Sequence, residues 1–294
     1  MTTLAKTFGY SSKADAVSSG TASSIYNPTF VVGIEVEVEN ARDRNPGASP
    51  WFAQTDGSLR NDGREFVTPP LASNSIEVYT NPFWDQMPAR WTFSQRTSIH
   101  VHVNARDLTW QQLKMWLLTY CVFEKVLFDF AGVDRAKGIF CVPLLDTQYP
   151  DYMISKLVAR QHGAQGNWEK YSAVNLSRLS DLGTVEFRHL PGTRDKEKVL
   201  LWLKVLDDIR TAGISFTEEQ FLALLDMGSG RAMMHRVFSQ RVLDVFATKQ
   251  IEALCKEGVD VVRTALAGEK IRDAYIAGLS LDSPFNKWLL KGRK

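Results

Sequence analysis

Acidic residues occupy every second position near the end of the segment VVGIEVEVEN, residues 31–40. Alternate side chains of a β-strand lie on opposite faces, so Glu35, Glu37 and Glu39 share one face and the valine and isoleucine side chains share the other. A strand so rich in valine and isoleucine belongs in a sheet beside a core. Its carboxylates lie roughly 7 Å apart and repel one another unless solvent or a cation intervenes. The segment therefore predicts either a solvated sheet face or a divalent-metal site, for which oxygen ligands favour Mg²⁺ or Mn²⁺.

Two later segments repeat this alternation with other polar residues. TSIHVHVN, residues 97–104, places His100 and His102 on one face, and TVEFRHL, residues 184–190, places Glu186 and Arg188 on one face and His189 on the apolar side. Taken alone, a His-x-His pair is more often structural than ligating, and Glu-x-Arg is often a cross-strand ion pair. Together they form a coherent set, because carboxylates hold magnesium while magnesium and arginine neutralise phosphate. We expect a concave polar front and an apolar back covered by helices.

Helical patterns follow and separate these strands. Thr109 and Gln112 form a predicted capping box before a helix whose apolar pattern continues to Phe130. A second helix is predicted from about Asp195 to Arg210, with Gly213 at its end. From Thr217 onward the pattern is helical, with breaks expected near 228–230, 258 and 283–284. The order predicts an α+β fold, with a largely antiparallel sheet backed by helices and a helical C-terminal region.

Composition narrows the functional classes. The net charge of +2 predicts neither a nucleic-acid nor a membrane partner. Three cysteines without CxxC spacing argue against a disulfide framework or a zinc site and suit a reducing compartment. The most apolar stretch, residues 115–133, contains three charged residues and reads as a buried helix, and the N-terminus lacks the layout of a signal peptide. A cytoplasmic protein is therefore predicted.

The chain divides into three predicted parts. Residues 1–28 are rich in serine, threonine and alanine and are expected to form an arm that is flexible or ordered by a partner. Residues 29–214 form the expected catalytic domain, and residues 215–294 a helical region packed on it or extending it. Homo-oligomerisation or a protein partner, contacted through residues 1–28 and the C-terminal helices, stays open.

Read in order, these segments resemble the amidoligase family of the glutamine synthetase-like carboxylate–amine ligases, a group frequent in phages and fungi. The resemblance covers roughly residues 30–210, and the ordered series is specific although no single piece is. Its pieces are GIEVE at 33–37, TDGS at 55–58, EFVTP at 65–69, HVH at 100–102, YSAVNL at 171–176 and TVEFR at 184–188. Arg135 and the CVP of residues 141–143 resemble the family's mid-chain arginine and Cys-x-Pro segment. One departure is Lys170 before Tyr171, where the family has arginine, because lysine loses bidentate phosphate recognition.

The resemblance implies a glutamine synthetase-like concave sheet that binds ATP and Mg²⁺ or Mn²⁺. Phosphorylation of a substrate carboxylate and attack by an amine would then yield an amide or peptide bond. If the chain is phage-encoded, it would act in the host cytoplasm. The metal ligands it implies are Glu35, Glu37, Glu186 and His102. The nucleotide contacts it implies are His100, His102, Arg188 and Lys170. The catalytic residues it implies are Arg188, Arg135, Asp56, Glu65 and Asn175.

Two other functions fit the same sequence. A metal-dependent phosphohydrolase or nuclease also uses acidic strands with histidines, although the chain lacks a strong basic stripe for nucleic acid. A ligase-like fold recruited as a structural or interaction protein of a virus particle would use the arm and the helical tail for contacts. The ligase hypothesis predicts small-molecule or peptide carboxylate and amine substrates.

Overall fold

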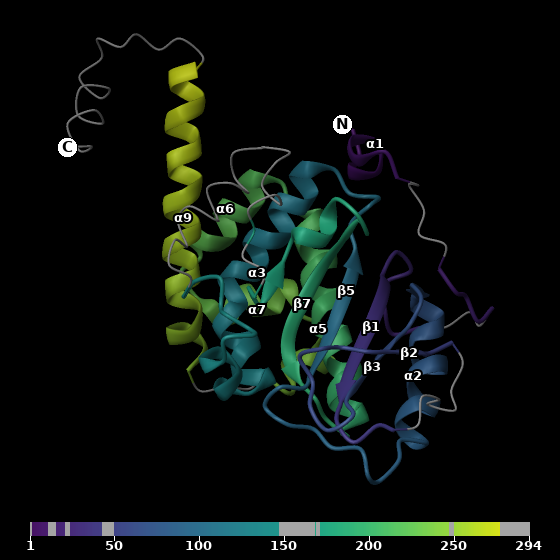
Figure 1. The fold of residues 1–294 in the computed structure, drawn as a ribbon. Coiled ribbons are helices and arrows are strands. Elements are labelled where there is room, and N and C mark those ends of the chain that lie inside the picture. The colour runs from purple at the N-terminus through teal and green to yellow at the C-terminus, as the bar shows by residue number, and fades with distance from the viewer. Residues whose placement is uncertain are drawn as a thin grey trace.

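An antiparallel β-sheet lies at the centre of the fold, with helices behind it (Figure 1). The computed structural model describes residues 2–10, 16–20, 24–42, 50–146, 168, 171–246 and 250–276, with the backbone alone for 269–276. Within these residues seven strands pair in the order β2-β3-β1-β5-β7-β6, and β4 pairs with the start of β1. The strands are β1 (Val31–Val38), β2 (Phe52–Gln54), β3 (Arg64–Val67), β4 (Leu71–Ala72), β5 (Ser98–Asn104), β6 (Val174–Asn175) and β7 (Thr184–Pro191).

The three strands with polar faces are neighbours in this sheet. Glu35 of β1 lies opposite His100 of β5, and His102 of β5 lies opposite Glu186 of β7. Because residues in register across neighbouring strands point to the same face, the acidic and histidine rows meet on one surface. The predicted α+β fold with a largely antiparallel sheet backed by helices is confirmed.

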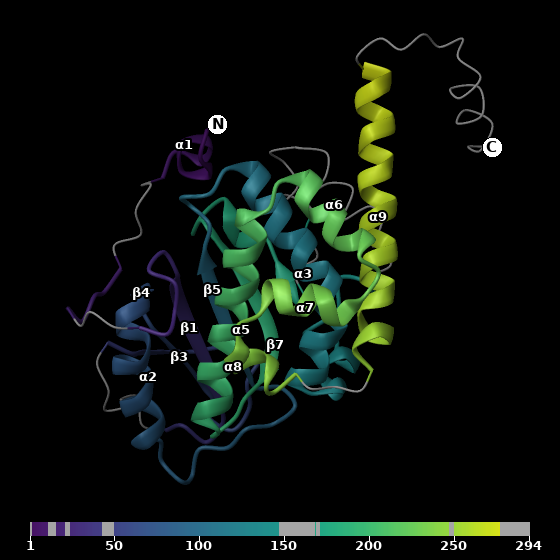
Figure 2. The ribbon, with the colours of Figure 1, turned by 180° about the vertical axis from the view of Figure 1, so that it is seen from behind.

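The opposite face of the sheet packs against α3 (Trp110–Ala131) and α5 (Lys196–Ser215), which lie across it in the view from behind (Figure 2). Val32, Ile34, Val36 and Val38 are at most 1% exposed. Burying each of these side chains stabilises the fold by about 1.5–3 kcal/mol, which commits the alternate glutamates to the front face. The ring of Phe187 on β7 lies 5.8 Å from the ring of Tyr120 on α3.

The two long helices start where their capping residues predicted. Thr109 and Gln112 form the capping box of α3, and the Asp195 carboxylate accepts a hydrogen bond from the backbone N–H of Lys198 at the start of α5. The predicted ends at two glycines were wrong, because Gly213 lies inside α5 and Gly258 lies inside α9 (Ile251–Ile276). A Cβ on Gly213 would lie 2.5 Å from a backbone atom of α3, and one on Gly258 would lie 2.3 Å from another. Both glycines permit close helix packing against α3.

The remaining helices surround this core. They are α1 (Leu4–Phe8), α2 (Ile76–Asp85), α6 (Glu218–Asp226), α7 (Gly230–Val237) and α8 (Gln240–Leu243), with 3₁₀ turns η1 (Ser73–Ser75), η2 (Val133–Lys137) and η4 (Ser177–Leu179). The helical C-terminal region is confirmed, including a break between α6 and α7, whereas the break expected at 283–284 lies outside the described residues. Among the described helices, none combines the length and apolar character needed to cross a bilayer.

Parts of the predicted N-terminal arm contact the sheet and its helices. The backbone N–H of Leu4 donates to the carbonyl of Leu108 at 2.8 Å, and that of Val17 donates to the carbonyl of Pro70 at 2.8 Å. The buried Tyr26 hydroxyl donates to the carbonyl of Leu200 on α5 at 3.1 Å. These described residues are therefore ordered by the chain's own domain. The division into residues 1–28, 29–214 and 215–294 stays a prediction.

Candidate active site

A cavity of about 350 Å³ lies on the polar front face of the sheet. Most of the residues predicted for a site contribute to its lining, and they come from β1, β3, β5, β6, β7 and the turn after β2. These residues are Glu35, Glu37, Asp56, Glu65, His100, His102, Asn175, Glu186 and Arg188. The His100 side chain is 4% exposed and that of Glu186 is 5% exposed, so this face is not a solvated sheet surface. Burying so many ionisable groups requires partners for their charges.

Glu35 connects both histidines of β5. Its Oε1 lies 3.1 Å from His102 Nε2, and its Oε2 lies 3.3 Å from His100 Nδ1. Thr184 Oγ1 lies 3.0 Å from the other ring nitrogen of His102 and orients the imidazole. Burial alone would raise the pKa of Glu35, but the hydrogen bonds from both histidines outweigh it and hold the pKa far below its usual range. Burial would lower the pKa of His102, but the hydrogen bond to Glu35 and the charge of that carboxylate raise it.

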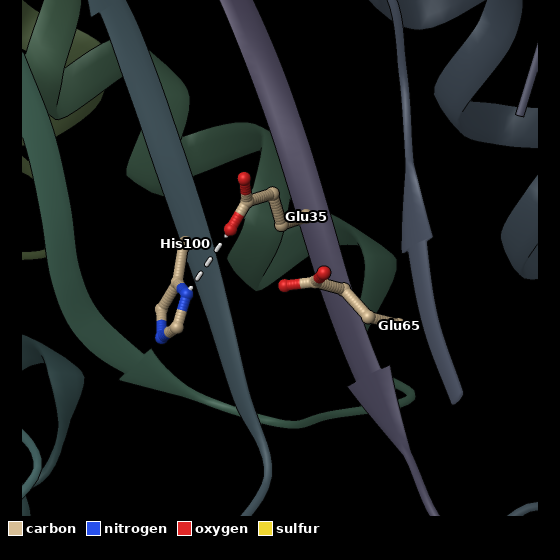
Figure 3. A group of neighbouring side chains, drawn as sticks. All are labelled: Glu35, Glu65 and His100. Atoms are coloured by element: carbon tan, nitrogen blue, oxygen red, sulfur yellow. Dashed lines mark hydrogen bonds and ion pairs between the residues drawn. The ribbon is translucent and has the colours of Figure 1, made fainter. Parts of the chain in front are cut away.

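Two further carboxylates, Glu65 and Glu37, face the cavity from neighbouring strands. Figure 3 shows the carboxylates of Glu35 and Glu65 and the imidazole of His100 turned toward one another. Burial and the charge of Glu35 raise the pKa of Glu65 to about 8, although Gln54 donates a 2.6 Å hydrogen bond to it. Glu37 accepts a 2.7 Å hydrogen bond from the Ser98 backbone N–H. The pKa of Glu37 is nevertheless raised, because burial disfavours the charged carboxylate more strongly than His100, Arg188 and this hydrogen bond favour it.

The opposite wall of the cavity comes from β7 and β6. Arg188 forms a close ion pair with Glu186, and its Nε donates to the carbonyl of Phe140 at 3.3 Å. The Asn175 amide donates to the second oxygen of Glu186 at 2.9 Å. The Arg188 side chain is 15% exposed, so its positive charge lies at the cavity surface rather than in the core. This wall offers a guanidinium to an anionic ligand.

The strand β7 contains a bulge at Arg188 and His189. The register passes from Ile99 opposite Leu190 to Val101 opposite Phe187, so two residues of β7 stand where β5 has one. A bulge re-aims side chains and leaves backbone groups outside the ladder. Arg135 supplies donors there, to the carbonyl of Arg188 at 3.0 Å and to the carbonyl of His189 at 3.1 Å.

Arg135 itself does not line the cavity. Its guanidinium also donates to Ser98 Oγ at 2.9 Å and so joins the ends of β5 and β7. The structure therefore places Arg135 where its hydrogen bonds position the bulged segment of β7, and its expected role at the phosphoryl group stays a prediction. Glu39, which the implied ligand set leaves out, accepts from the Arg60 backbone N–H at 3.3 Å and does not line the cavity. Lys170, an expected nucleotide contact, lies outside the described residues.

Three sets of side chains have the spacing of a cation site. In each set, ligand atoms of three residues all lie within 4.8 Å of one another. The sets are Glu35 with His102 and Glu186, Glu35 with Glu65 and His100, and Glu37 with Asp56 and Glu65. The purely carboxylate set has the oxygen donors that Mg²⁺ and Mn²⁺ prefer, whereas the two sets with an imidazole also suit Zn²⁺ or Fe²⁺. The carboxylate donors therefore fit the divalent cation that the sequence predicted.

Sequence patterns missed several residues that line the cavity. They are Gln54, Ser58, Arg96, Ser98, Phe140, Tyr171, Ser177 and Arg178. Ser98 stands in the same alternating row as His100, and Tyr171 belongs to the YSAVNL segment, so a signal existed for both. Arg96 and Arg178 lie outside the alternating strand patterns, and only the folded chain brings their guanidinium groups to this cavity.

The fold and cavity define an α+β protein whose polar sheet face can hold a divalent cation beside an arginine. A family model described as "Putative amidoligase enzyme" matches residues 29–209. Since this match covers more than half of the 294 residues, the chain belongs to that family. No curated protein matches the chain.

One solved structure with similarity to the chain is a bifunctional glutathione synthetase from Pasteurella multocida. The two share 12% sequence identity with a TM-score of 0.37, and the similarity covers 82% of this chain. It covers 52% of the other, so this chain matches about half the length of that protein.

Proposed function

We propose that the chain is an ATP- and Mg²⁺-dependent carboxylate–amine ligase that forms an amide or peptide bond through an acyl phosphate. The observation that supports this most strongly is the cation-site spacing of Glu35, His102 and Glu186, whose ligand atoms lie within 4.8 Å of one another. Arg188 forms an ion pair with Glu186 in the same cavity. Family membership supports the same reaction class. The substrates would be a small-molecule or peptide carboxylate and an amine, and a cytoplasmic location stays a prediction.

The carboxylate–imidazole set provides the place for a cation. Glu35, His102 and Glu186 would hold one divalent ion, and Glu37, Asp56 and Glu65 offer a second set of oxygen ligands. A bound cation supplies charge neutralisation for the phosphates of ATP. Arg188 contributes a fixed positive charge at the same wall and would stabilise the charge on the transferring phosphoryl group.

The reaction has two steps that balance without another reagent. A carboxylate oxygen of the first substrate bonds to the γ-phosphorus of ATP, and the bond to ADP breaks. The amine nitrogen then bonds to the acyl carbon, and phosphate leaves with one former carboxylate oxygen. The amine also loses a proton, for which Asp56 and the ionised form of Glu65 are the candidate acceptors in the cavity. Because positioning and charge neutralisation do most of this chemistry, the chain needs no covalent nucleophile.

Hydroxylamine tests the proposal without knowledge of the natural amine. The full chain would be incubated with Mg²⁺, ATP, hydroxylamine and a mixture of amino acids and short peptides as carboxylate donors. The expected products are a hydroxamate and an equal amount of ADP, because hydroxylamine captures an acyl phosphate. With an ¹⁸O-labelled carboxylate, one labelled oxygen is expected in the released phosphate. ADP formation without ¹⁸O transfer would contradict the acyl-phosphate route.

The alternatives predict different products. A phosphohydrolase or nuclease would cleave a phosphomonoester or phosphodiester with Mn²⁺ and would not need ATP. A structural protein of a virus particle would no longer assemble when residues 1–28 are deleted, and the double variant Glu35→Ala with Glu37→Ala would assemble normally. The ligase proposal predicts the opposite pattern, with catalysis lost in the double variant.

A further inference from the structure

A recess in the sheet surface adjoins the cavity at Gly33. This glycine lies on the front-facing row of β1 between Val31 and Glu35, opposite His102 of β5. Its φ lies outside the left-handed region, so the backbone conformation does not require glycine. A Cβ placed there would lie 3.7 Å from His102 Cβ and 4.0 Å from the Thr68 carbonyl oxygen, which is ordinary contact. Glycine weakens a strand interior, and it often marks a place where a ligand approaches the backbone closely.

Apolar side chains form the walls of this recess. It encloses about 190 Å³, and its apolar walls come from Val31, Val67, Pro70 and Leu182. Glu35 and His102 line both the recess and the polar cavity, so the two spaces meet at the candidate metal ligands. A ligand atom held by these two residues would therefore have apolar space directly beside it.

The polar groups at the rim already have partners within the chain. The Asn104 amide donates to Asp107 at 2.8 Å, and the Thr68 hydroxyl accepts from the Ile34 backbone N–H at 2.9 Å. Arg106 Nε donates to the Leu182 carbonyl at 2.9 Å. The recess is thus suited to an apolar group. At about 190 Å³ it is also smaller than the roughly 300–1,000 Å³ typical of whole small-molecule sites, so it fits one part of a ligand.

The nucleotide fits the other end of the cavity better. There a space of about 1,070 Å³ shares Arg96 and Phe140 with the polar cavity, and Arg135 and Lys137 also line it. Cationic and aromatic side chains suit phosphates and a base. In ATP the ribose and α-phosphate separate the base from the reacting phosphate. A group bound in the Gly33 recess, directly beside Glu35 and His102, is better explained as part of the molecule whose carboxylate reacts.

We propose that the Gly33 recess binds the apolar side chain of the carboxylate substrate, while that substrate's carboxylate lies at the cation site formed by Glu35, His102 and Glu186. The substrate class is therefore a carboxylic acid with an aliphatic or aromatic group close to its reacting end. This inference rests on the proposed ligase function, which supplies the carboxylate and its place beside the cation.

A series of simple acids tests the recess directly. Binding of acetate, butyrate and hexanoate to the full chain with Mg²⁺ would be measured by calorimetry or ligand-detected NMR. Affinity is expected to increase about fourfold for each methylene that enters the recess. Gly33→Ala should weaken hexanoate binding several-fold, and Gly33→Leu should remove the dependence on chain length by filling the recess. Mn²⁺ affinity of Gly33→Ala, followed by electron paramagnetic resonance, should stay within about twofold, since the added Cβ meets ordinary contacts.

Gly268→Leu is the matched control, because nothing lies within 4 Å of a Cβ at that exposed position. It should bind the three acids as the unchanged chain does. Equal affinity for acetate and hexanoate, or a chain-length dependence that persists in Gly33→Leu, would overturn the inference while leaving the ligase proposal intact. Failure of all three acids to bind in the presence of bound Mg²⁺ would also overturn the inference, while the hydroxylamine assay decides the ligase proposal separately.

Discussion

Two clusters of glutamate and histidine lie on opposite faces of the same sheet. On the front, Glu35 contacts both histidines of β5 beside a cavity. On the back, Tyr120 connects Glu124 and His189, with its hydroxyl 2.5 Å from a Glu124 oxygen and 3.0 Å from His189 Nε2. The residue types are nearly the same in both places, but their surroundings differ.

The back cluster is closed and supplies its own hydrogen-bond donors. Glu124 is fully buried and accepts from the backbone N–H groups of Leu144 and Leu145 at 2.6 and 2.8 Å. It therefore holds the loop that follows Cys141-Val-Pro143 against α3. Burial raises the pKa of Glu124 to about 7, and Glu124 lines none of the three spaces described above. Such a cluster stabilises the fold, whereas the front cluster opens to a ligand-sized cavity.

The largest effect is expected from removing the centre of the back cluster. Glu124→Ala leaves two buried N–H groups and a phenolic hydroxyl without their acceptor, at about 1–3 kcal/mol each. We expect the free energy of unfolding in denaturant to fall by about 4 kcal/mol, with Mn²⁺ affinity unchanged in the folded fraction. Glu124→Gln, which keeps one acceptor oxygen, should lose less. A loss below about 1 kcal/mol for Glu124→Ala would show that the back cluster is not a stabilising one.

On the front face we expect substitution to change metal affinity more than stability. Glu35→Gln should lower Mn²⁺ affinity by about 100-fold or more, because even groups that merely orient metal ligands contribute about 10–100-fold. Stability should fall by less than in Glu124→Ala, because glutamine keeps one acceptor oxygen for the histidines of β5. Titration with Mn²⁺ monitored by electron paramagnetic resonance measures the first effect and denaturant unfolding the second. Unchanged Mn²⁺ binding in Glu35→Gln would remove Glu35 from the site.

The pH dependence of stability should reveal His189. Burial, together with the charge of Arg135, lowers the pKa of His189 from 6.5 to about 3. The folded protein therefore holds the ring neutral where the unfolded chain protonates it, so stability is lost as pH falls below about 6.5 and down to about 3. Between pH 7 and 5 the loss should be about 2 kcal/mol, at up to 1.4 kcal/mol per pH unit.

His189→Phe isolates this contribution from those of other titrating groups. The difference in free energy of unfolding between the unchanged chain and His189→Phe, measured at each pH, should shrink by about 2 kcal/mol from pH 7 to pH 5. A difference that stays constant from pH 7 to 5 would mean that His189 takes up its proton equally in the folded and unfolded chain, so that burial does not lower its pKa.

The smallest effect is expected at Glu39, which continues the acidic row of β1 outside the cavity. Its side chain accepts a backbone hydrogen bond from Arg60, and its backbone pairs with Thr92. Glu39→Gln keeps an acceptor oxygen and should change Mn²⁺ affinity by no more than about twofold. A loss comparable to that of Glu35→Gln would mean that the cation site extends along the whole acidic row.

The front cluster was largely predictable because strand side chains alternate with a strict period of two. The rows in β1, β5 and β7 follow from that period, and so does the buried position of His189. The short strands β2 and β4 were missed, because two or three residues cannot display an alternation. Gly213 and Gly258 were misread as helix ends, since sequence alone does not reveal which glycines allow close packing with a second helix.

The arginines depend on tertiary structure and were harder to predict. The sequence did not predict that Arg135 also satisfies two carbonyls left by the bulge in β7. A bulge is a mismatch between two strands, so neither strand's own sequence announces it. Arg96 reaches the cavity from the segment before β5, where no periodic pattern marks its direction.

Anomalous diffraction from a crystal grown with Mn²⁺ and a non-hydrolysable ATP analogue would locate the cation and the nucleotide directly. We expect a manganese peak coordinated by Glu35, His102 and Glu186, with the terminal phosphate of the analogue next to Arg188. A manganese peak away from these side chains, or a nucleotide bound elsewhere on the chain, would show that this sheet face is not the ATP and cation site.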